Sequence, residues 1–483
     1  MRDLLAYQRH ATPEGVALID AETDEEWTYR EFDRRVEKTA SRLWSMGVRP
    51  GAQLGTLLDL SPDFARLVHA TWRVGAVLVP LNTRLAETEL RARMDRIDLA
   101  ALISEEAYAK QATGIASEIP FRPISELRSE PLAEFVTEVP ALDSPRTMVF
   151  TSGTTGEPKA AVLTGRNLVS SAVASAFRLG VLPNDRWYNP LPGYHMGGLA
   201  PIVRSALYGT TVVLSSEFDA TRAMDHLRTY SVTGSSLVPT MLDRMLDAGD
   251  LPDSLRFVLT GGARTPERLI ERCESREIPI HPTYGMTETA SQISTATPEE
   301  AFQHPKRVGR PLTFTRVRAV AGDEALPPGE PGEIVVSGPT VMAGYYGDSD
   351  ATDDAFGPHG YHTGDLGVIE RDGSIRVLGR LDDVIITGGE NVHPEEVSNV
   401  LDRHPAVEAA AVVSLPDPEW GERVAASVVA DGVSEHDLRE FLANRLADYK
   451  HPKTIGFADS LPRTVSGTID RAAVRERLSE HWP

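Results

Sequence analysis

The most informative segment of this chain is Thr151-Ser152-Gly153-Thr154-Thr155-Gly156-Glu157-Pro158-Lys159-Ala160. It follows the apolar run 147–150 (TMVF), so we expect a strand that leads into a loop rich in glycine and hydroxyl groups. Glycine lets the main chain approach an anion closely, and hydroxyl, backbone N–H and lysine groups donate hydrogen bonds to phosphate oxygens. The loop therefore predicts a polyphosphate site, although it lacks the GxxxxGK[ST] pattern of a Walker A loop.

A polar surface turn is the alternative interpretation of this loop. It would explain the serine, threonine and glycine residues, but not a Pro158-Lys159 ending in a chain with only six lysines among 49 basic residues. We therefore favour the phosphate site.

Apolar runs and helix-like stretches alternate on both sides of the loop. Residues 29–47 repeat apolar positions every three to four residues, and short apolar runs end in glycine or proline before the next helix-like stretch. The runs are 55–60 (GTLLDL), 76–81 (AVLVPL), 211–216 (TVVLSS), 235–246 (SSLVPTMLDRML) and 255–262 (LRFVLTGG). This alternation predicts an α/β fold with a largely parallel sheet covered by helices.

The pattern changes after about residue 312. Short strands broken by proline and glycine follow, and the pair Asp372-Gly373 predicts a β-hairpin in a small β-rich section. An α+β tail comes after Gly379. We expect a large N-terminal domain of α/β subdomains with this β-rich section over residues 1–378, a hinge over 379–385 and a small, mobile C-terminal domain over 386–483.

Composition excludes several classes of protein. The net charge of -21 argues against a nucleic-acid partner, and an acidic, lysine-poor chain favours a salt-rich cytoplasm, with a merely soluble acidic protein as the alternative. The lone Cys273 forms no intrachain disulfide, which fits a reducing interior. The first residues have no apolar signal-peptide region and no 18-residue apolar run exists, so we expect a cytoplasmic protein without membrane spans.

Five ordered motifs resemble the adenylate-forming superfamily, which includes acyl-CoA synthetases, the adenylation domains of peptide synthetases, and luciferases. The motifs are the 151–160 loop, Gly193–Gly198 (GYHMGG), Tyr284–Thr289 (YGMTET), Tyr361–Asp365 (YHTGD) and Gly379–Asp383 (GRLDD). The resemblance covers essentially the whole chain. It implies the acyl-CoA synthetase fold and an enzyme that activates a carboxylic acid with ATP and Mg²⁺.

The resemblance also implies the nucleotide contacts. Tyr284 is expected to stack on adenine, Asp365 to accept hydrogen bonds from the ribose hydroxyls, Arg380 to donate to ribose or phosphate, and Glu288 to hold Mg²⁺. A loop glutamate in solvent and a structural turn aspartate are the alternatives for Glu288 and Asp365. The remaining predicted nucleotide contacts are Thr151, Ser152, Gly153, Thr154, Thr155, Gly156, Lys159, Gly261, Gly262, Ala263, Gly285, Met286 and Thr287.

The same resemblance gives further residues roles in the second half-reaction. His195 is expected to border the acyl pocket and the thiol entry, although a lone histidine is often just a satisfied polar residue. Asp382 matches the hinge about which the small domain rotates. Gly388 and Gly389 resemble the passage for the pantetheine arm of CoA. Trp420 is expected either to contact CoA or to pack inside the small domain.

One position departs from the superfamily. A catalytic lysine is expected at the end of a P-[RK]-x-x-x-G-K segment, but residues 462–468 read PRTVSGT, so Thr468 stands there. Losing one preorganised donor typically costs roughly 100- to 1,000-fold in rate. Arg463, Lys450 or Lys453 could substitute. A degenerate nucleotide-binding regulatory protein is the rival class, and a ligase that loads a carrier protein is a third hypothesis.

Stretches 194–214 and 388–397 look most like the ligases that join 2-succinylbenzoate to CoA in menaquinone synthesis. Aryl-CoA ligases of the halobenzoate type and medium-chain acyl-CoA synthetases are the alternatives. The expected partners are a small carboxylic acid, ATP and CoA, with no redox cofactor, and we keep a homodimer as a hypothesis.

Overall fold

The computed structural model describes residues 3–116, 119–135, 141–151, 158–387, 390–418, 420–443, 445–464 and 468–481. Contacts within the chain divide it into two units. Unit 1 holds residues 1–316 and 336–361, and unit 2 holds residues 317–335 and 362–483. This division places part of the β-rich section with the C-terminal residues. The hinge at 379–385 stays a prediction.

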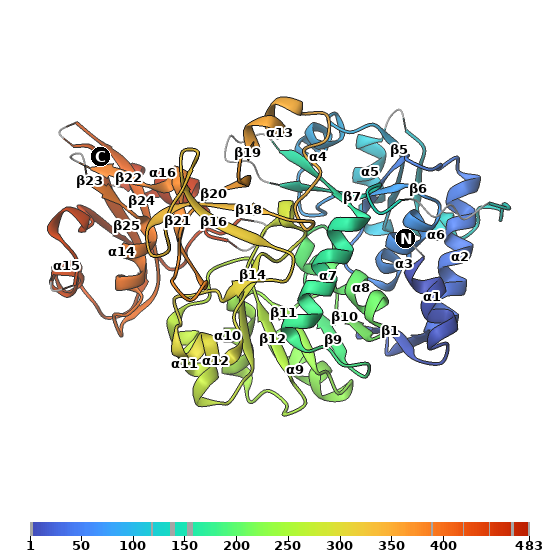
Figure 1. The fold of residues 1–483 in the computed structure, drawn as a ribbon, viewed down its shortest axis with the longest axis horizontal. Coiled ribbons are helices and arrows are strands. Elements are labelled where there is room, and N and C mark those ends of the chain that lie inside the picture. The colour runs from blue at the N-terminus through green and yellow to red at the C-terminus, as the bar shows by residue number, and fades with distance from the viewer. Residues whose placement is uncertain are drawn as a thin grey trace. The chain divides into compact units, whose positions relative to one another are not determined.

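A nine-stranded sheet runs through unit 1, and its middle strands, from β13 to β1, are parallel (Figure 1). In spatial order the strands are β15 (Arg310–Pro311), β14 (Ser294–Thr295), β13 (Ile280–Tyr284), β12 (Phe257–Thr260), β11 (Gly234–Leu237), β9 (Arg186–Asn189), β10 (Thr211–Leu214), β1 (Val16–Asp20) and β2 (Glu25–Thr28). Antiparallel strands close both edges.

The second sheet of unit 1 has six strands. Their spatial order is β6 (Phe121–Pro123), β5 (Leu99–Ser104), β3 (Gln53–Leu57), β4 (Val77–Pro80), β7 (Pro145–Thr151) and β8 (Lys159–Thr164). All are parallel except β8, which pairs antiparallel with β7. The carboxyl end of β7 is therefore the place where the predicted phosphate loop begins.

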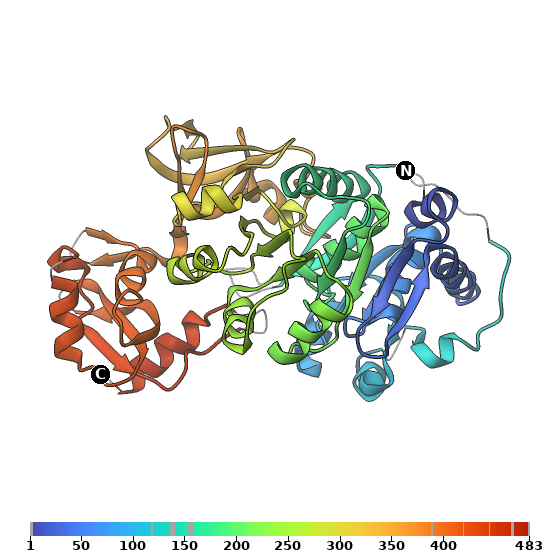
Figure 2. The same cartoon turned by 90° about the horizontal axis from the view of Figure 1, so that it is seen from below.

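Helices cover the sheets of unit 1, and Figure 2 shows green helices along the green strands of the nine-stranded sheet. The helices are α1 (Leu4–Ala11), α2 (Tyr29–Ser45), α3 (Pro62–Arg73), α4 (Glu87–Met94), α5 (Ala109–Ile115), α6 (Ile124–Leu127), α7 (Gly165–Leu179), α8 (Met196–Tyr208), α9 (Ala220–Thr229), α10 (Pro239–Ala248), α11 (Glu267–Ser275), α12 (Pro298–Gln303) and α13 (Ser349–Ala355).

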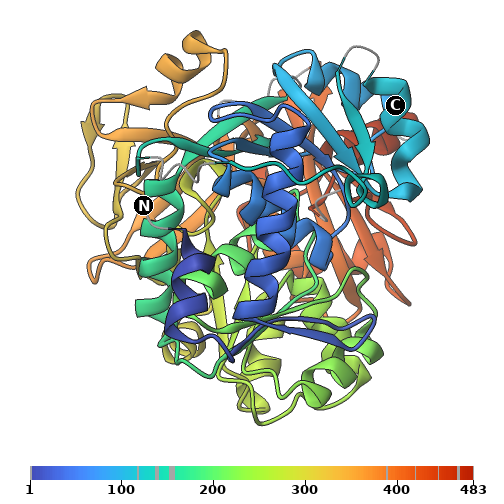
Figure 3. The same cartoon turned by 90° about the vertical axis from the view of Figure 1, so that its right-hand side faces the viewer.

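Local sequence explains where helix α2 starts. Thr28 accepts a hydrogen bond from the backbone N–H of Glu31, and the Glu31 carboxylate accepts one from the backbone N–H of Thr28. This capping box satisfies donors that the first turn leaves without partners. Helix α2 then packs against α1 and α3, and α1 and α2 appear as blue helices in Figure 3.

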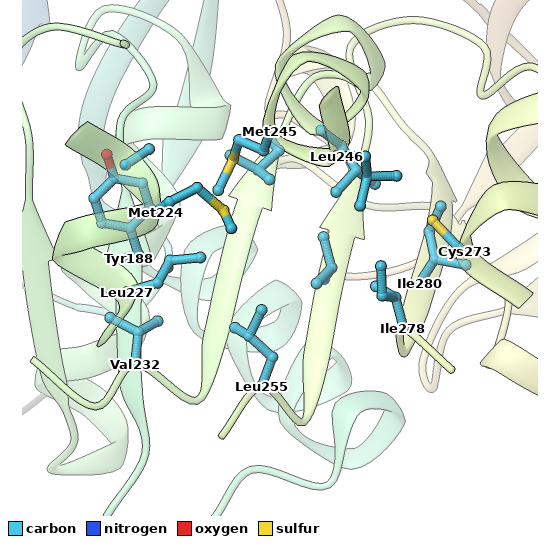
Figure 4. Packing of buried hydrophobic residues seen from close by; sticks show 14 of the residues in the cluster. Tyr188, Met224, Leu227, Val232, Met245, Leu246, Leu255, Cys273, Ile278 and Ile280 are labelled. Atoms are coloured by element: carbon cyan, nitrogen blue, oxygen red, sulfur yellow. The ribbon is translucent and has the colours of Figure 1, made fainter. Parts of the chain in front are cut away.

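A large hydrophobic core cluster fills the space between the nine-stranded sheet and the helices α9, α10 and α11. Tyr188 comes from β9, Leu227 from α9, Met245 from α10 and Cys273 from α11, and Figure 4 shows these side chains packed over the strands. Each is 2% exposed or less. The strands carry continuous apolar runs because helices cover them, as parallel sheets require.

Unit 2 contains a small sheet at its start, and the chain passes between the units within β16, β18 and β20. The strands of this sheet lie in the order β17 (Glu324–Ala325), β16 (Arg316–Ala321), β18 (Pro331–Ser337), β20 (Gly360–Ile369) and β19 (Phe356–Gly357), with β21 (Ile375–Arg380) paired to β20; β19 itself belongs to the residues of unit 1. The predicted hairpin at Asp372-Gly373 is confirmed, since it joins β20 to β21 and Gly373 has a φ of 82°.

The C-terminal residues form an α+β layer. Strands β23 (Glu390–Val392), β22 (Ile385–Thr387), β25 (Gly421–Ala430) and β24 (Val407–Asp417) follow one another in space, and β26 (Thr454–Phe457) pairs with β25. The helices are α14 (Pro394–Leu401), α15 (Glu435–Ala443) and α16 (Arg471–His481). The predicted α/β class is thus confirmed, and no helix of the described residues is long and apolar enough to cross a membrane.

Candidate functional site

Three predicted segments lie at one edge of the nine-stranded sheet. Segment Gly193–Gly198 follows β9, residues 261–263 follow β12, and residues 284–288 close β13 and continue beyond it. Strands β9, β11, β12 and β13 are parallel neighbours, so their carboxyl ends meet at this edge. Ligands of open α/β sheets bind outside the carboxyl ends of the strands. These three predicted segments therefore lie at the edge where such sheets bind ligands.

Two of the predicted glycines are required by close packing. A Cβ atom on Gly285 would lie 1.8 Å from the carbonyl oxygen of Ser291, and one on Gly261 would lie 2.7 Å from Cγ2 of Thr283. The turn that follows Gly285 is tight, because Ala290 and Ser291 both have positive φ angles, 53° and 103°. Packing alone therefore explains why glycine stands at positions 261 and 285. The nucleotide contacts of these two residues stay predictions, as do those of Gly262, Ala263, Met286 and Thr287.

Glu288 is buried, with 8% of its surface exposed, at the 3₁₀ turn Thr287–Thr289. The hydroxyl of Tyr345 donates a hydrogen bond to Glu288 Oε1 over 3.2 Å. The backbone N–H of Met342 donates to the Glu288 carbonyl over 2.7 Å. The alternative of a solvated loop glutamate is therefore wrong, because both the backbone and the carboxylate are held in place.

Lys159 lies near the same tyrosine, although it precedes both Glu288 and Tyr345 by more than a hundred residues in the sequence. Its Nζ lies 5.2 Å from the centroid of the Tyr345 ring, within cation–π range. Strand β8 holds this geometry, since Tyr346 N–H donates to the Ala160 carbonyl and Ala161 forms an antiparallel bridge with Tyr345. Tyr345 thus connects the lysine of the phosphate loop to the carboxylate of Glu288.

The start of the phosphate loop has a defined register. Thr151 on β7 lies opposite Lys159 on β8, and its Oγ1 donates to the Lys159 carbonyl over 3.4 Å. Ser152, Gly153, Thr154, Thr155 and Gly156 lie outside the described residues.

His195 lies at the N-cap position of α8, and its Nε2 is buried without a hydrogen-bond partner among the described residues. The hydroxyl of the neighbouring Tyr194 is likewise buried without a partner, and the two rings lie 4.8 Å apart. Buried polar atoms are normally hydrogen-bonded, so the Nε2 of His195 next to the sheet edge has a hydrogen-bonding position that a ligand could use. The interpretation of His195 as a satisfied polar residue is not supported.

Burial is the main cause that lowers the pKa of His195, to about 4, and the charge of Arg84 acts in the same direction. In the unfolded chain this histidine has a pKa of about 6.5. Between about pH 6.5 and pH 4 the unfolded chain therefore binds a proton at His195 that the folded chain does not. Stability therefore falls as the pH drops through this window. We expect this histidine to reduce the free energy of unfolding by up to about 1.4 kcal/mol per pH unit.

Urea unfolding at pH 7 and pH 5 measures this effect. His195→Gln should show a smaller loss of stability on acidification than the original chain, whereas the exposed control His436→Gln should behave like the original chain. Equal losses in the two variants would contradict the assignment.

A polar group that sequence reasoning missed lies at the carboxyl edge of the six-stranded sheet. Asp59 follows β3 and accepts hydrogen bonds from the Thr83 hydroxyl over 2.8 Å and the Tyr108 hydroxyl over 2.6 Å. Burial, with the Asp59 charge as a further cause, raises the pKa of Glu105 to about 7. These residues belong to no motif, so only the parallel strand order brings them together.

In unit 2 the structure brings together the predicted ribose pair. Asp365 on β20 lies directly opposite Arg380 on β21, and Arg380 Nη1 donates to Asp365 Oδ1 over 3.0 Å and to the Thr363 carbonyl over 2.9 Å. Asp365 is 7% exposed. Glu333 holds the preceding residues of β20, because its carboxylate accepts from the Gly364 N–H over 3.0 Å and contacts His362.

The remaining predicted residues of unit 2 lie in different local environments. Asp382 lies exposed in the 3₁₀ turn Leu381–Asp383. Trp420 is 43% exposed with Lys453 Nζ 4.3 Å from its ring centroid, so it does not pack in a core. Gly388 and Gly389 lie outside the described residues.

Thr468 contacts another threonine. Its hydroxyl lies 2.7 Å from the Thr464 hydroxyl, and its carbonyl accepts from the Thr464 N–H over 2.7 Å. Lys450, a proposed substitute for the missing lysine, donates to both carboxylate oxygens of Glu396 over 2.6 and 2.7 Å. In this arrangement of unit 2, Lys450 thus forms an ion pair with Glu396, and Lys453 forms a cation–π contact with Trp420.

Residues 5–346 match the AMP-binding enzyme family, and residues 396–468 match the AMP-binding enzyme C-terminal domain. The chain belongs to the AMP-binding enzyme family. This membership confirms the superfamily resemblance carried by the five motifs. The 2-succinylbenzoate–CoA ligase of Bacillus licheniformis is 38% identical over 471 residues, which are 97% of this chain and 98% of that ligase. The enzyme of the same name from Bacillus mycoides is 36% identical over 99% of both chains.

Solved structures agree with these relatives. The o-succinylbenzoate CoA synthetase from Bacillus subtilis in complex with the acyl-adenylate intermediate OSB-AMP has a TM-score of 0.93, 34% identity and 98% coverage of each chain. The same enzyme in complex with ATP and magnesium ion has a TM-score of 0.92, 34% identity and 99% coverage of each chain. ATP-bound MatB from Rhodopseudomonas palustris has a TM-score of 0.93 at 26% identity, over 100% of this chain and 99% of MatB. These relatives give the alternative of a degenerate regulatory protein no support.

Proposed function

We propose that this chain is an ATP-dependent acid–CoA ligase that makes an acyl-adenylate and passes the acyl group to the thiol of CoA. One observation carries the proposal: Tyr345 stands between Lys159 Nζ, 5.2 Å from its ring, and the buried carboxylate of Glu288. The cation of Lys159 suits the phosphate oxygens of a metal-bound triphosphate, and the carboxylate of Glu288 suits its metal ion.

The adenylation step needs charge control at the leaving group. A carboxylate oxygen of the acid attacks the α-phosphorus of ATP, and the bond from this phosphorus to the bridging oxygen breaks, which releases pyrophosphate. Lys159 is placed to donate to the phosphate oxygens as their charge grows.

Glu288 fits a magnesium ion, which would offset phosphate charge when bound. Its carboxylate is preorganised by the Tyr345 hydroxyl. Among the described residues no group of three or more ligating side chains gathers, so the nucleotide's phosphates and water would supply the other ligands.

The second step transfers the acyl group. The thiol attacks the carbonyl carbon of the acyl-adenylate, and AMP leaves. We assign His195 to the acyl pocket, because its buried Nε2 has an unused hydrogen-bonding position and its lowered pKa keeps the imidazole neutral near pH 7. Gly388, Gly389 and Trp420 remain the proposed CoA contacts, Asp365 and Arg380 the ribose contacts, and Asp382 the hinge.

We propose 2-succinylbenzoate as the acid. The support is that relatives named for this substrate align over 97% or more of the chain at 36% to 38% identity. Aryl-CoA ligase activity is the second candidate, since 2-succinylbenzoate is itself an aromatic acid. A cytoplasmic location and a homodimer stay predictions.

Thr468→Lys tests the departure at the C-terminal motif. We expect this variant to release pyrophosphate at least about 10-fold faster, since a preorganised donor of this kind is typically worth roughly 100- to 1,000-fold. Single-turnover pyrophosphate release at saturating ATP and acid measures the gain, and Thr464→Lys is the matched control. No gain would mean that another group supplies the cation.

The proposed function is tested by incubating the protein with ATP, Mg²⁺, CoA and a panel of acids at high and low salt. The panel contains 2-succinylbenzoate, benzoate, 4-chlorobenzoate, octanoate and malonate. AMP and a CoA thioester should appear with 2-succinylbenzoate above all others. Acyl-AMP without thioester would favour a carrier-protein acceptor, and ATP binding without AMP from any acid would contradict the proposal.

A further inference from the structure

A cavity of about 1330 Å³ lies in unit 1 between the β1–β2 hairpin, α2, the start of α3 and the residues after β5 and α6. None of the residues assigned above to the nucleotide, the acyl group or CoA lines it. The cavity is open to solvent on one side, and its volume is large enough for a metabolite-sized ligand. No motif of the sequence pointed to this part of the chain.

Cationic side chains line one wall of this cavity. Arg35, Lys38 and Arg42 share one face of α2, because they are spaced three and four residues apart. Arg35 stacks over the ring of Trp27 at 5.1 Å. Among the described residues, Lys38 and Arg42 form no hydrogen bond through their side chains and no ion pair, and the Nε of Arg42 is buried. Three cations thus face the cavity without a bound carboxylate.

A fourth cation comes from α3. Arg66 is 9% exposed, and its buried Nε has no acceptor among the described residues. Asp63 contacts Arg66 Nη2 over 2.8 Å with one oxygen and Arg128 Nη2 over 2.8 Å with the other. One carboxylate therefore serves two guanidinium groups. Burial lowers the pKa of Arg66, and the charges of Arg128, Arg35 and Arg42 also act against its charged form.

The lining also contains seven carboxylates, of which, among the described residues, only that of Asp63 forms an ion pair with the cations of the cavity; Glu25 and Glu26 lie exposed on β2. Glu31 is held by the capping box of α2, Asp20 accepts from the Thr23 hydroxyl, and Glu106 accepts from the Ser125 N–H. Glu105 has a pKa raised to about 7 by burial, with the Asp59 charge as a further cause. The Nε atoms of Arg42 and Arg66 are buried without acceptors among the described residues, and because buried donors without acceptors are costly, an anion that accepts from them would stabilise this arrangement.

We propose that this cavity is a second ligand site, separate from the nucleotide site, for a small organic polyanion with at least two phosphate or carboxylate groups. Guanidinium groups bind both kinds of anion through paired hydrogen bonds. Arg42, Arg66 and Arg128 provide such groups from three different helices or helix ends, which suits a ligand whose charges lie several atoms apart. The site does not depend on the ligase activity.

Calorimetric titration tests this site directly. The protein is used without ATP and without Mg²⁺, because ATP is itself a polyanion that could fill this site and Mg²⁺ binds both probes. Fructose 1,6-bisphosphate and citrate are then titrated separately at fixed, moderate ionic strength. We expect one equivalent of at least one probe to bind, and the stronger probe tells whether phosphate or carboxylate is preferred.

Variants decide where the probe binds. Arg42→Gln and Arg66→Gln should each weaken binding at least about 10-fold, whereas Lys159→Gln in the phosphate loop and the exposed Arg244→Gln on α10 should leave it unchanged. Arg42 is the decisive position if the more deeply buried Arg66 variant fails to fold. Absence of binding by both probes, equal binding by the Arg42 and Arg244 variants, or binding that chloride abolishes at equal concentration would overturn the proposal.

Discussion

Glu288→Gln is expected to release pyrophosphate roughly 100- to 1,000-fold more slowly than the original chain at saturating ATP and acid. Glutamine keeps the size of the side chain and an acceptor for the Tyr345 hydroxyl, which donates to Glu288 over 3.2 Å. It removes the negative charge that a hard cation requires. The loss should therefore appear mainly in kcat and in the concentration of Mg²⁺ needed for half-maximal rate.

Glu274→Gln is the matched control for this variant. Glu274 is exposed on α11 and lies outside all predicted motifs. It should have the rate of the original chain. A Glu288→Gln protein with an unchanged rate and an unchanged Mg²⁺ requirement would remove the metal role from this carboxylate.

Lys159→Gln is expected to have the second large effect, a loss of roughly 100-fold or more in the same step. Glutamine still donates hydrogen bonds but has no charge to offset the triphosphate. The contact with the Tyr345 ring also disappears, because that contact needs the ammonium group 5.2 Å from the centroid. Stopped-flow detection of pyrophosphate, with titration of ATP, separates loss of binding from loss of rate.

Lys110→Gln controls for the removal of one positive charge from this acidic chain. Lys110 is exposed on α5. The control should keep the original rate, and Lys159→Arg should recover only part of it, since a planar guanidinium is not equivalent to a compact ammonium. Equal rates for Lys159→Gln and Lys110→Gln would contradict the phosphate role.

The fold was largely predictable from local patterns. The apolar runs at 76–81 and 211–216 became β4 and β10, and the amphipathic stretch from residue 29 became α2. Turn chemistry predicted the β20–β21 hairpin at Asp372-Gly373. The division into two parallel sheets was not predictable, because continuous apolar strands carry no information about which neighbour each one pairs with.

The candidate site was predictable only where a motif marks it. Glu288, Asp365 and Arg380 could be proposed as site residues because each belongs to a recognisable segment. Tyr345 was missed, since its partners Lys159 and Glu288 are far away in sequence and only the folded sheet joins them. The arginine-lined cavity was missed for the same reason. Helix α2 reads as an ordinary charged surface until α3 is placed beside it.

The most direct test of the central claim is acid-dependent exchange of labelled pyrophosphate into ATP. The claim is that Lys159 and Glu288 hold the metal-bound triphosphate while a carboxylate displaces pyrophosphate. We predict exchange that requires 2-succinylbenzoate and Mg²⁺, falls at least about 100-fold in both Lys159→Gln and Glu288→Gln, and stays unchanged in Lys110→Gln and Glu274→Gln. Undiminished exchange in the two site variants would contradict the claim.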